Sequence, residues 1–277
     1  MDTFVAKPNT NEHFADTHSN DKKAANSVNA IIAGATGLIG SELVKQLLVS
    51  NDISSVSALV RRPVPIQHPK LIQIQDSNLA ITHWNETTPK PDMGFICLGT
   101  TKKQAGSKQA LAAVDVDLVT QVAQTMRSLG VKKIAVVSSF GADSRSPFHY
   151  LKCKGNMEEN LLDLNFEQVV FVRPGPLLGK RNQVRKDEQV LQVVLAMLRP
   201  LLIGPLANFK PIDAKHVAKA MILALSTAQS PSEPSLTSSN HGSNLDEQNK
   251  HSSHKNRTLH QRCRLNSCEM IKLIDKG

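Results

Sequence analysis

Apolar residues are concentrated in the middle of the chain, between two polar regions. Residues 1–27 and 226–261 are rich in Asn, Ser, Lys, His and other polar residues and contain few large apolar side chains. Such segments cannot bury enough apolar surface to offset the entropy lost on ordering. We therefore expect a disordered leader over residues 1–27 and a disordered polar insertion over residues 226–261.

Between these regions, short apolar runs alternate with stretches of helical periodicity. The runs are typical of strands buried in a parallel sheet, and the periodic stretches are typical of helices that cover it. The pattern predicts one α/β domain over residues 28–225 with a doubly wound parallel sheet, a substrate lobe from about residue 180, and a C-terminal helix over residues 262–277 that docks on the core. The predicted strands are 28–33, 54–60, 71–75, 94–98, 132–139 and 168–173, and the predicted helices are 38–48, 112–129, 150–164, 186–198, 211–225 and 268–274.

A glycine-rich turn separates the first predicted strand from the first predicted helix. Gly34, Gly37 and Gly40 stand three residues apart, and Thr36 lies between the first two. Glycines let a backbone approach a ligand closely, and the free N–H groups at a helix start favour a pyrophosphate. The turn therefore predicts a dinucleotide site, with a purely structural turn as the alternative.

The residues at the ends of the second and fourth strands indicate which cofactor binds and where it makes contact. An acidic residue after the second strand would bind the ribose 2′-hydroxyl of NAD, but this chain has Arg61 and Arg62 there. Guanidinium groups suit the 2′-phosphate of NADP, so we expect NADP(H) to be preferred over NAD(H); a solvated basic pair is the alternative. Leu98, Gly99 and Thr100 come at the end of the fourth strand, where open sheets bind ligands, and we expect them to contact the cofactor.

Candidate catalytic residues follow the fifth strand. Tyr150 is the only tyrosine in the chain, and Lys154 lies four residues later, so the two share one face of a predicted helix. An ammonium near a phenol favours the phenolate, while a serine hydroxyl fixes a substrate oxygen, and the strand itself ends in Ser138 and Ser139. This set predicts an acid/base site for hydride transfer. The alternative is a tyrosine that anchors the helix beside a solvated lysine.

Composition and charge exclude several other classes of function. The net charge is +9, but with one Trp and one Tyr the chain lacks the aromatic residues that stack on bases, so we expect no nucleic-acid partner. No apolar run reaches bilayer length, so no membrane partner is expected. The four scattered cysteines and the absence of an export signal indicate a cytoplasmic protein, and the His and Cys spacing matches no common metal site.

The motifs taken together resemble those of a known family. IIAGATGLIG, CLGTTKKQAG, VVSSFGAD, YLKCKGNMEENL and VFVRPGPLLG occur in this order, as in the atypical short-chain dehydrogenases of the Tat-interacting-protein (CC3) type. The resemblance implies an NADP(H)-binding Rossmann fold with catalytic Ser139, Tyr150 and Lys154, where Ser138 is the alternative serine. The cofactor would then contact Gly34, Thr36, Gly37, Leu38, Ile39, Gly40, Arg61, Arg62, Leu98, Gly99, Thr100, Tyr150, Lys154 and Pro174, and Asp76 would approach the adenine unless it is an ordinary loop carboxylate.

Two functions compete on this basis. The first is an NADP(H)-dependent oxidoreductase that acts on a small carbonyl or alcohol substrate, with Tyr150 as acid and base. The second is a non-catalytic NADPH-binding protein whose cofactor occupancy is read by a protein partner. The intact set of Ser139, Tyr150 and Lys154 favours the first.

Overall fold

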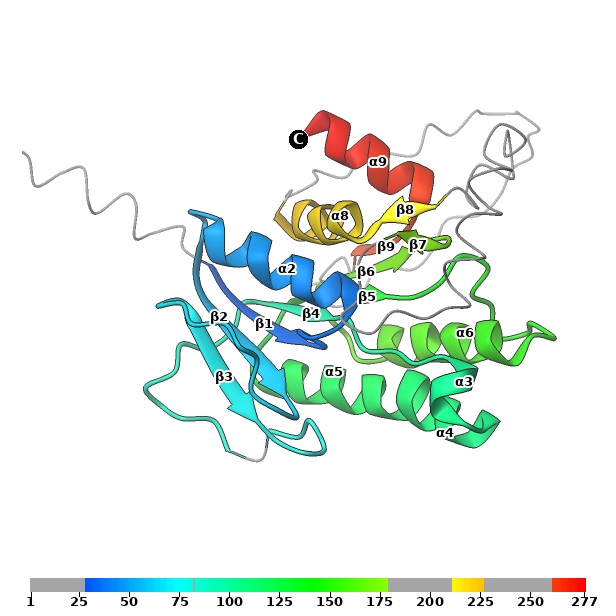
Figure 1. The fold of residues 1–277 in the computed structure, drawn as a ribbon, viewed down its shortest axis with the longest axis horizontal. Coiled ribbons are helices and arrows are strands. Elements are labelled where there is room, and N and C mark those ends of the chain that lie inside the picture. The colour runs from blue at the N-terminus through cyan, green and yellow to red at the C-terminus, as the bar shows by residue number, and fades with distance from the viewer. Residues whose placement is uncertain (1–27, 82, 179–210, 227–260) are drawn as a thin grey trace, which may run out of the picture.

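The computed structural model describes residues 28–81, 83–178, 211–226 and 261–277 (Figure 1). The predicted leader, the predicted helix over residues 186–198 and most of the predicted substrate lobe lie outside these residues. The predicted polar insertion also lies outside them, apart from its end residues Ser226 and Gln261.

Seven parallel strands form one sheet in the order β3-β2-β1-β4-β5-β6-β9. The strand order reverses between β1 and β4, and in open α/β sheets ligands bind at the carboxyl ends of the strands beside such a reversal. A further pair, β7 and β8, forms a two-stranded sheet. The strands are β1 Val28–Ala33, β2 Ile53–Val60, β3 Leu71–Gln75, β4 Met93–Ile96, β5 Lys133–Val137, β6 Gln168–Arg173, β7 Leu177–Leu178, β8 Ile212–Asp213 and β9 Gln261–Asn266.

Helices cover both faces of the large sheet, which confirms the doubly wound α/β prediction (Figure 1). Three helices pack on one face, and the others, with a π-helical segment η1, pack on the opposite face. The first group is α2 Leu38–Val49, α8 Ala214–Ser226 and α9 Ser267–Lys276, and the second is α3 Lys102–Ala105, α4 Lys108–Ala112, η1 Ala113–Leu118, α5 Val119–Ser128 and α6 His149–Leu162.

Two apolar clusters fill the space between the layers. On one face, Leu43 of α2, Met221 of α8 and Met270 of α9 pack on the sheet. On the other face, Met126 of α5 and Met157 of α6 do the same. Because side chains of a strand point alternately to both faces, a central strand must be apolar at most positions, and β1 (VNAIIA) is apolar at every position except Asn29.

The C-terminal segment differs from its prediction. Residues 262–277 were expected to form a docking helix, but Gln261–Asn266 form β9, which pairs in parallel with β6 before α9 begins. The alternation of Arg262, Cys263, Arg264 and Leu265 explains the strand, because Cys263 and Leu265 pack against the core while both arginines are exposed. None of the helices within the described ranges is long and apolar enough to cross a bilayer.

Candidate cofactor site and active site

The glycine turn connects β1 to α2 at the reversal of the strand order. Gly34 has φ +90°, and a Cβ there would lie 2.6 Å from the carbonyl of Cys97 at the end of β4. A Cβ on Gly40 would lie 2.0 Å from the Gly34 oxygen. Both glycines are therefore required by the close packing of the turn, whether or not a ligand binds.

The start of α2 provides a site for an anion. Gly37 is its N-cap, in extended backbone conformation, and no side chain caps the helix among the described residues. The first N–H groups of an uncapped helix and its dipole attract negative charge. Leu38 and Ile39 follow directly, so the residues expected at a pyrophosphate surround this helix end.

A cavity of about 470 Å³ joins the turn to the end of β2, and we call it the arginine cavity. It brings together Gly34, Thr36, Arg61, Arg62 and Leu98, which the sequence predicted as cofactor contacts from three separate motifs. Both arginine side chains are exposed. A phosphate group entering this cavity would therefore meet two guanidinium groups that reach solvent.

Asp76 follows β3 and shapes the neighbouring loop. Its Oδ1 accepts hydrogen bonds from the backbone N–H groups of Asn78 (2.8 Å) and Ala80 (2.9 Å). Asn78, with Arg61, lines a further cavity of about 480 Å³, whereas Asp76 does not line it. The structure thus gives Asp76 a loop-holding role and leaves its expected approach to adenine a prediction.

A third cavity, of about 200 Å³, is lined by the predicted catalytic residues, and we call it the tyrosine cavity. Leu98 lines both this cavity and the arginine cavity, so the two lie on either side of it. The predicted site residues that line the tyrosine cavity are Gly37, Leu38, Ile39, Leu98, Gly99, Thr100, Ser138, Ser139, Tyr150, Lys154 and Pro174.

Helix α6 positions the tyrosine and the lysine. It begins at His149, one residue before the predicted start, and places Tyr150 and Lys154 one turn apart. Tyr150 is 38% exposed, whereas Lys154 is buried. The Lys154 ammonium lies 2.6 Å from Asp115 Oδ1 and donates a longer hydrogen bond, 3.4 Å, to the carbonyl of Val137. The lysine is therefore held at the floor of the cavity rather than solvated.

Asp115 is a site residue that the sequence analysis missed. The predicted helix over 112–129 is interrupted by the π-helical segment Ala113–Leu118, and this segment directs Asp115 into the interior. A π-helical turn adds a residue and so rotates the positions that face the core. Asp115 lies four residues after Leu111 and four before Val119, both buried, and this spacing is the signal that could have identified it.

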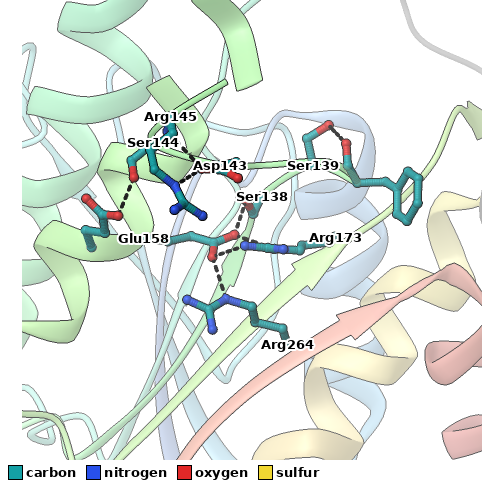
Figure 2. A network of polar contacts seen from close by, with 10 residues as sticks. Ser138, Ser139, Asp143, Ser144, Arg145, Glu158, Arg173 and Arg264 are labelled. Carbon is teal, nitrogen blue, oxygen red and sulfur yellow. Dashed lines mark hydrogen bonds and ion pairs between the residues drawn. The ribbon is translucent and has the colours of Figure 1, made fainter. Parts of the chain in front are cut away.

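The two serines after β5 have different surroundings (Figure 2). Ser138 is buried, and its hydroxyl donates a 2.6 Å hydrogen bond to Glu158. Within the described residues, the Ser139 hydroxyl has one hydrogen bond, a long contact of 3.4 Å to the carbonyl of Phe140. The Ser139 hydroxyl is thus the less engaged of the two.

Glu158 is the centre of a buried polar network that the sequence analysis also missed. Its side chain is 1% exposed and accepts hydrogen bonds from Ser138, from Arg173 of β6 (2.8 and 2.6 Å) and from Arg264 of β9 (2.9 Å). Figure 2 shows the two guanidinium groups converging on this one carboxylate. The network ties α6 to Ser138, directly after β5, to Arg173 at the end of β6, and to Arg264 within β9.

We expect Glu158→Gln to destabilise the fold by about 3 kcal/mol, the lower end of the range for breaking a buried ion pair. The lower end applies because Arg173 and Arg264 also line a cavity of about 520 Å³ and can be hydrated there. Urea unfolding measures this as a lower midpoint with an unchanged slope. The control is Glu159→Gln, an exposed neighbour, for which we expect about 0.5 kcal/mol or less. Equal urea midpoints for the two variants would contradict the assignment of Glu158 as the centre of the buried network.

Cys97, at the end of β4, also lines the tyrosine cavity. Burial raises the pKa of its thiol to about 12. The thiol is therefore neutral at physiological pH and is not a nucleophile. Among the described residues that line this cavity, Tyr150 and Lys154 remain as the groups that can carry acid/base chemistry.

Part of the chain matches a family model, and the chain is similar to curated proteins that share one name. Residues 93–203 match the family model described as HIM1. The chain is 35% identical over 215 residues to "Protein FMP52, mitochondrial" of Coccidioides immitis, covering 73% of this chain and 87% of the relative. It is 32% identical to the protein of the same name of Candida albicans, covering 70% of this chain and 86% of the relative.

Solved structures similar to this chain share its fold. One is "MoeE5 in complex with UDP-glucose and NAD", with TM-score 0.51, 19% identity and 72% of each chain covered. Another is the UDP-N-acetylglucosamine 4-epimerase of Methanobrevibacter ruminantium, with TM-score 0.53, 15% identity and 74% of each chain covered. At such identities the likeness concerns the fold alone. It confirms the Rossmann-type architecture, whereas the CC3 type expected from the motifs is not found among these relatives.

The expected cytoplasmic location is wrong. The relatives from Coccidioides immitis and Candida albicans, at 35% and 32% identity, are both named mitochondrial proteins. The error came from the cysteine argument, because scattered free cysteines exclude only an oxidising compartment and do not distinguish the cytoplasm from the interior of an organelle.

Proposed function

The chain belongs to the FMP52 family, and from its site we propose that it is an NADP(H)-dependent oxidoreductase, located in mitochondria, that acts on a small carbonyl or alcohol substrate. One observation carries the proposal. The arginine cavity and the tyrosine cavity adjoin at Leu98, so a basic pair, an uncapped helix start and a Ser–Tyr–Lys set lie along one continuous edge of the sheet.

This arrangement fits a dinucleotide phosphate. Arg61 and Arg62 would hold the 2′-phosphate, because guanidinium groups donate paired hydrogen bonds to phosphate oxygens. The N–H groups at the start of α2, near Gly37, would hold the pyrophosphate. Pro174, after β6, would lie beside the nicotinamide, since it lines the tyrosine cavity. Solved structures of the same fold, such as MoeE5, are described with NAD, which supports a nicotinamide cofactor.

The bound cofactor would supply or accept the hydride. The chain's own residues would manage the substrate oxygen and its proton. The Ser139 hydroxyl, the less engaged of the two serine hydroxyls, would donate a hydrogen bond to that oxygen. Tyr150, on the exposed side of the same cavity, would donate the proton during reduction and accept it during oxidation.

The test has two stages. Cofactor fluorescence during titration of the purified protein should show NADPH binding that is at least about tenfold tighter than NADH binding, because only NADPH carries the charge that Arg61 and Arg62 recognise. NADPH consumption is then followed with a panel of small aldehydes and ketones. Tight NADPH binding without turnover of any carbonyl would favour the non-catalytic binding function, and binding of neither cofactor would contradict both.

A further inference from the structure

A buried ion pair lies beneath the tyrosine cavity. Lys154 Nζ and Asp115 Oδ1 are 2.6 Å apart, and their side chains are only 3% and 0% exposed. A buried pair of this kind generally stabilises a fold no better than apolar residues of the same size would. Its position next to a proposed acid/base group therefore points to a functional role.

The carboxylate is fixed from two directions. Asp115 Oδ2 accepts a 3.0 Å hydrogen bond from the backbone N–H of Thr100, which follows β4. A Cβ on Gly99 would lie 3.3 Å from Asp115 Oδ1 and 3.5 Å from Lys154 Nζ, so the pair sits directly under that glycine. Because the backbone after β4 holds Oδ2, the carboxylate cannot turn away from the ammonium without losing this bond.

The charges near Tyr150 can be identified among the described residues. Lys154 is the one charged side chain that lines the tyrosine cavity in this part of the chain. Cys97, whose pKa burial raises to about 12, contributes no charge at neutral pH. The His149 ring, at the start of α6, is within hydrogen-bond distance of the Lys108 carbonyl (3.0 Å). Lys154, with Asp115 behind it, is therefore the charged pair that adjoins the cavity lined by Tyr150.

We infer that Asp115 is a positioning residue that acts on Tyr150 through Lys154, by fixing the ammonium under the cavity and offsetting its charge. Tyr150 then faces a neutral pair rather than a lone cation. A lone ammonium beside the phenol would favour the phenolate, whereas an ammonium offset by a carboxylate favours it less. The catalytic meaning of this inference rests on the proposed function, whereas the charge effect itself does not.

The charge effect can be measured without a substrate, because Tyr150 is the only tyrosine in the chain. Ultraviolet absorbance of tyrosinate during a pH titration therefore reports Tyr150 alone, and Tyr150→Phe gives the blank. In Asp115→Asn we expect tyrosinate to appear about one pH unit or more below the parent, because the ammonium is no longer offset. The matched control is Asp117→Asn on the same segment, whose charge is exposed and screened, and which should titrate with the parent. A titration of Asp115→Asn that coincides with the parent would overturn the inference.

A second comparison covers the case in which Asp115→Asn does not fold. The double variant Asp115→Asn, Lys154→Gln leaves no unpaired buried charge. In this double variant, tyrosinate should appear at about the same pH as in the parent. In Lys154→Gln alone it should appear about one pH unit higher, because the Asp115 charge is then unopposed. If the double variant follows Lys154→Gln instead, Asp115 has no electrostatic effect on Tyr150 and the inference is wrong. Failure of the parent to bind NADPH would contradict the proposed function and leave this result standing.

Discussion

Tyr150→Phe is expected to lower the turnover of a carbonyl substrate by a factor of about 10² to 10⁴ while leaving NADPH affinity almost unchanged. This range is typical for loss of a positioned general acid or base. The substitution removes one hydroxyl and keeps the ring, so the packing of the start of α6 is retained. Steady-state assays with the carbonyl found in the substrate screen, with NADPH binding measured in parallel, separate the two effects.

The control for this experiment is Lys152→Gln. Lys152 lies on the same helix, its side chain is exposed, and it does not line the tyrosine cavity. Its turnover should equal that of the parent protein. Turnover by Tyr150→Phe at the parental rate would remove Tyr150 from the mechanism, even if the cofactor assignment were correct.

Replacing Arg61 and Arg62 together by alanine is expected to weaken NADPH binding about a hundredfold and to leave NADH binding within a few-fold of the parent. A hydrogen bond to a charged group contributes about 1.5 kcal/mol or more, so two guanidinium groups on one phosphate contribute about 3 kcal/mol. Fluorescence titration of the double variant with both cofactors measures the change in selectivity directly.

The control is a double variant that also loses two positive charges, but at a place far from the cavities. Lys132 and Lys133 lie at the amino end of β5, at the edge of the sheet opposite the cavities. The variant Lys132→Ala, Lys133→Ala should bind NADPH as the parent does. A similar loss of affinity in both double variants would show that net charge, rather than a 2′-phosphate site, determines NADPH binding.

The features predicted correctly from sequence follow from residues close together in the chain or from the parallel arrangement of the strands. The first glycine turn follows from a buried strand, three glycines and an apolar helix that are continuous in the chain. Tyr150 and Lys154 are one helical turn apart, so their shared face follows from spacing alone. The meeting of Arg61 with Thr36 in one cavity was also predictable, because parallel strands bring their carboxyl ends to one edge of the sheet.

The features that sequence did not reveal depend on tertiary packing. Val114, Leu118, Val122 and Met126 are apolar at helical spacing, but the π-helical segment leaves Val114 and Leu118 only half-buried and turns Asp115 toward Lys154. Arg264 reaches Glu158 only because β9 pairs with β6 across more than ninety residues of sequence, as the partners Phe171 and Arg264 show. No local sequence pattern predicts a contact between residues so far apart in the chain.

The measurement that tests the central claim most directly is a crystal structure of the protein with NADP⁺ bound. The account predicts one cofactor across both cavities, with its 2′-phosphate on Arg61 and Arg62, its pyrophosphate at the start of α2 and its nicotinamide beside Tyr150 and Lys154. A cofactor bound elsewhere, or one whose nicotinamide lies outside the tyrosine cavity, would contradict the proposed oxidoreductase.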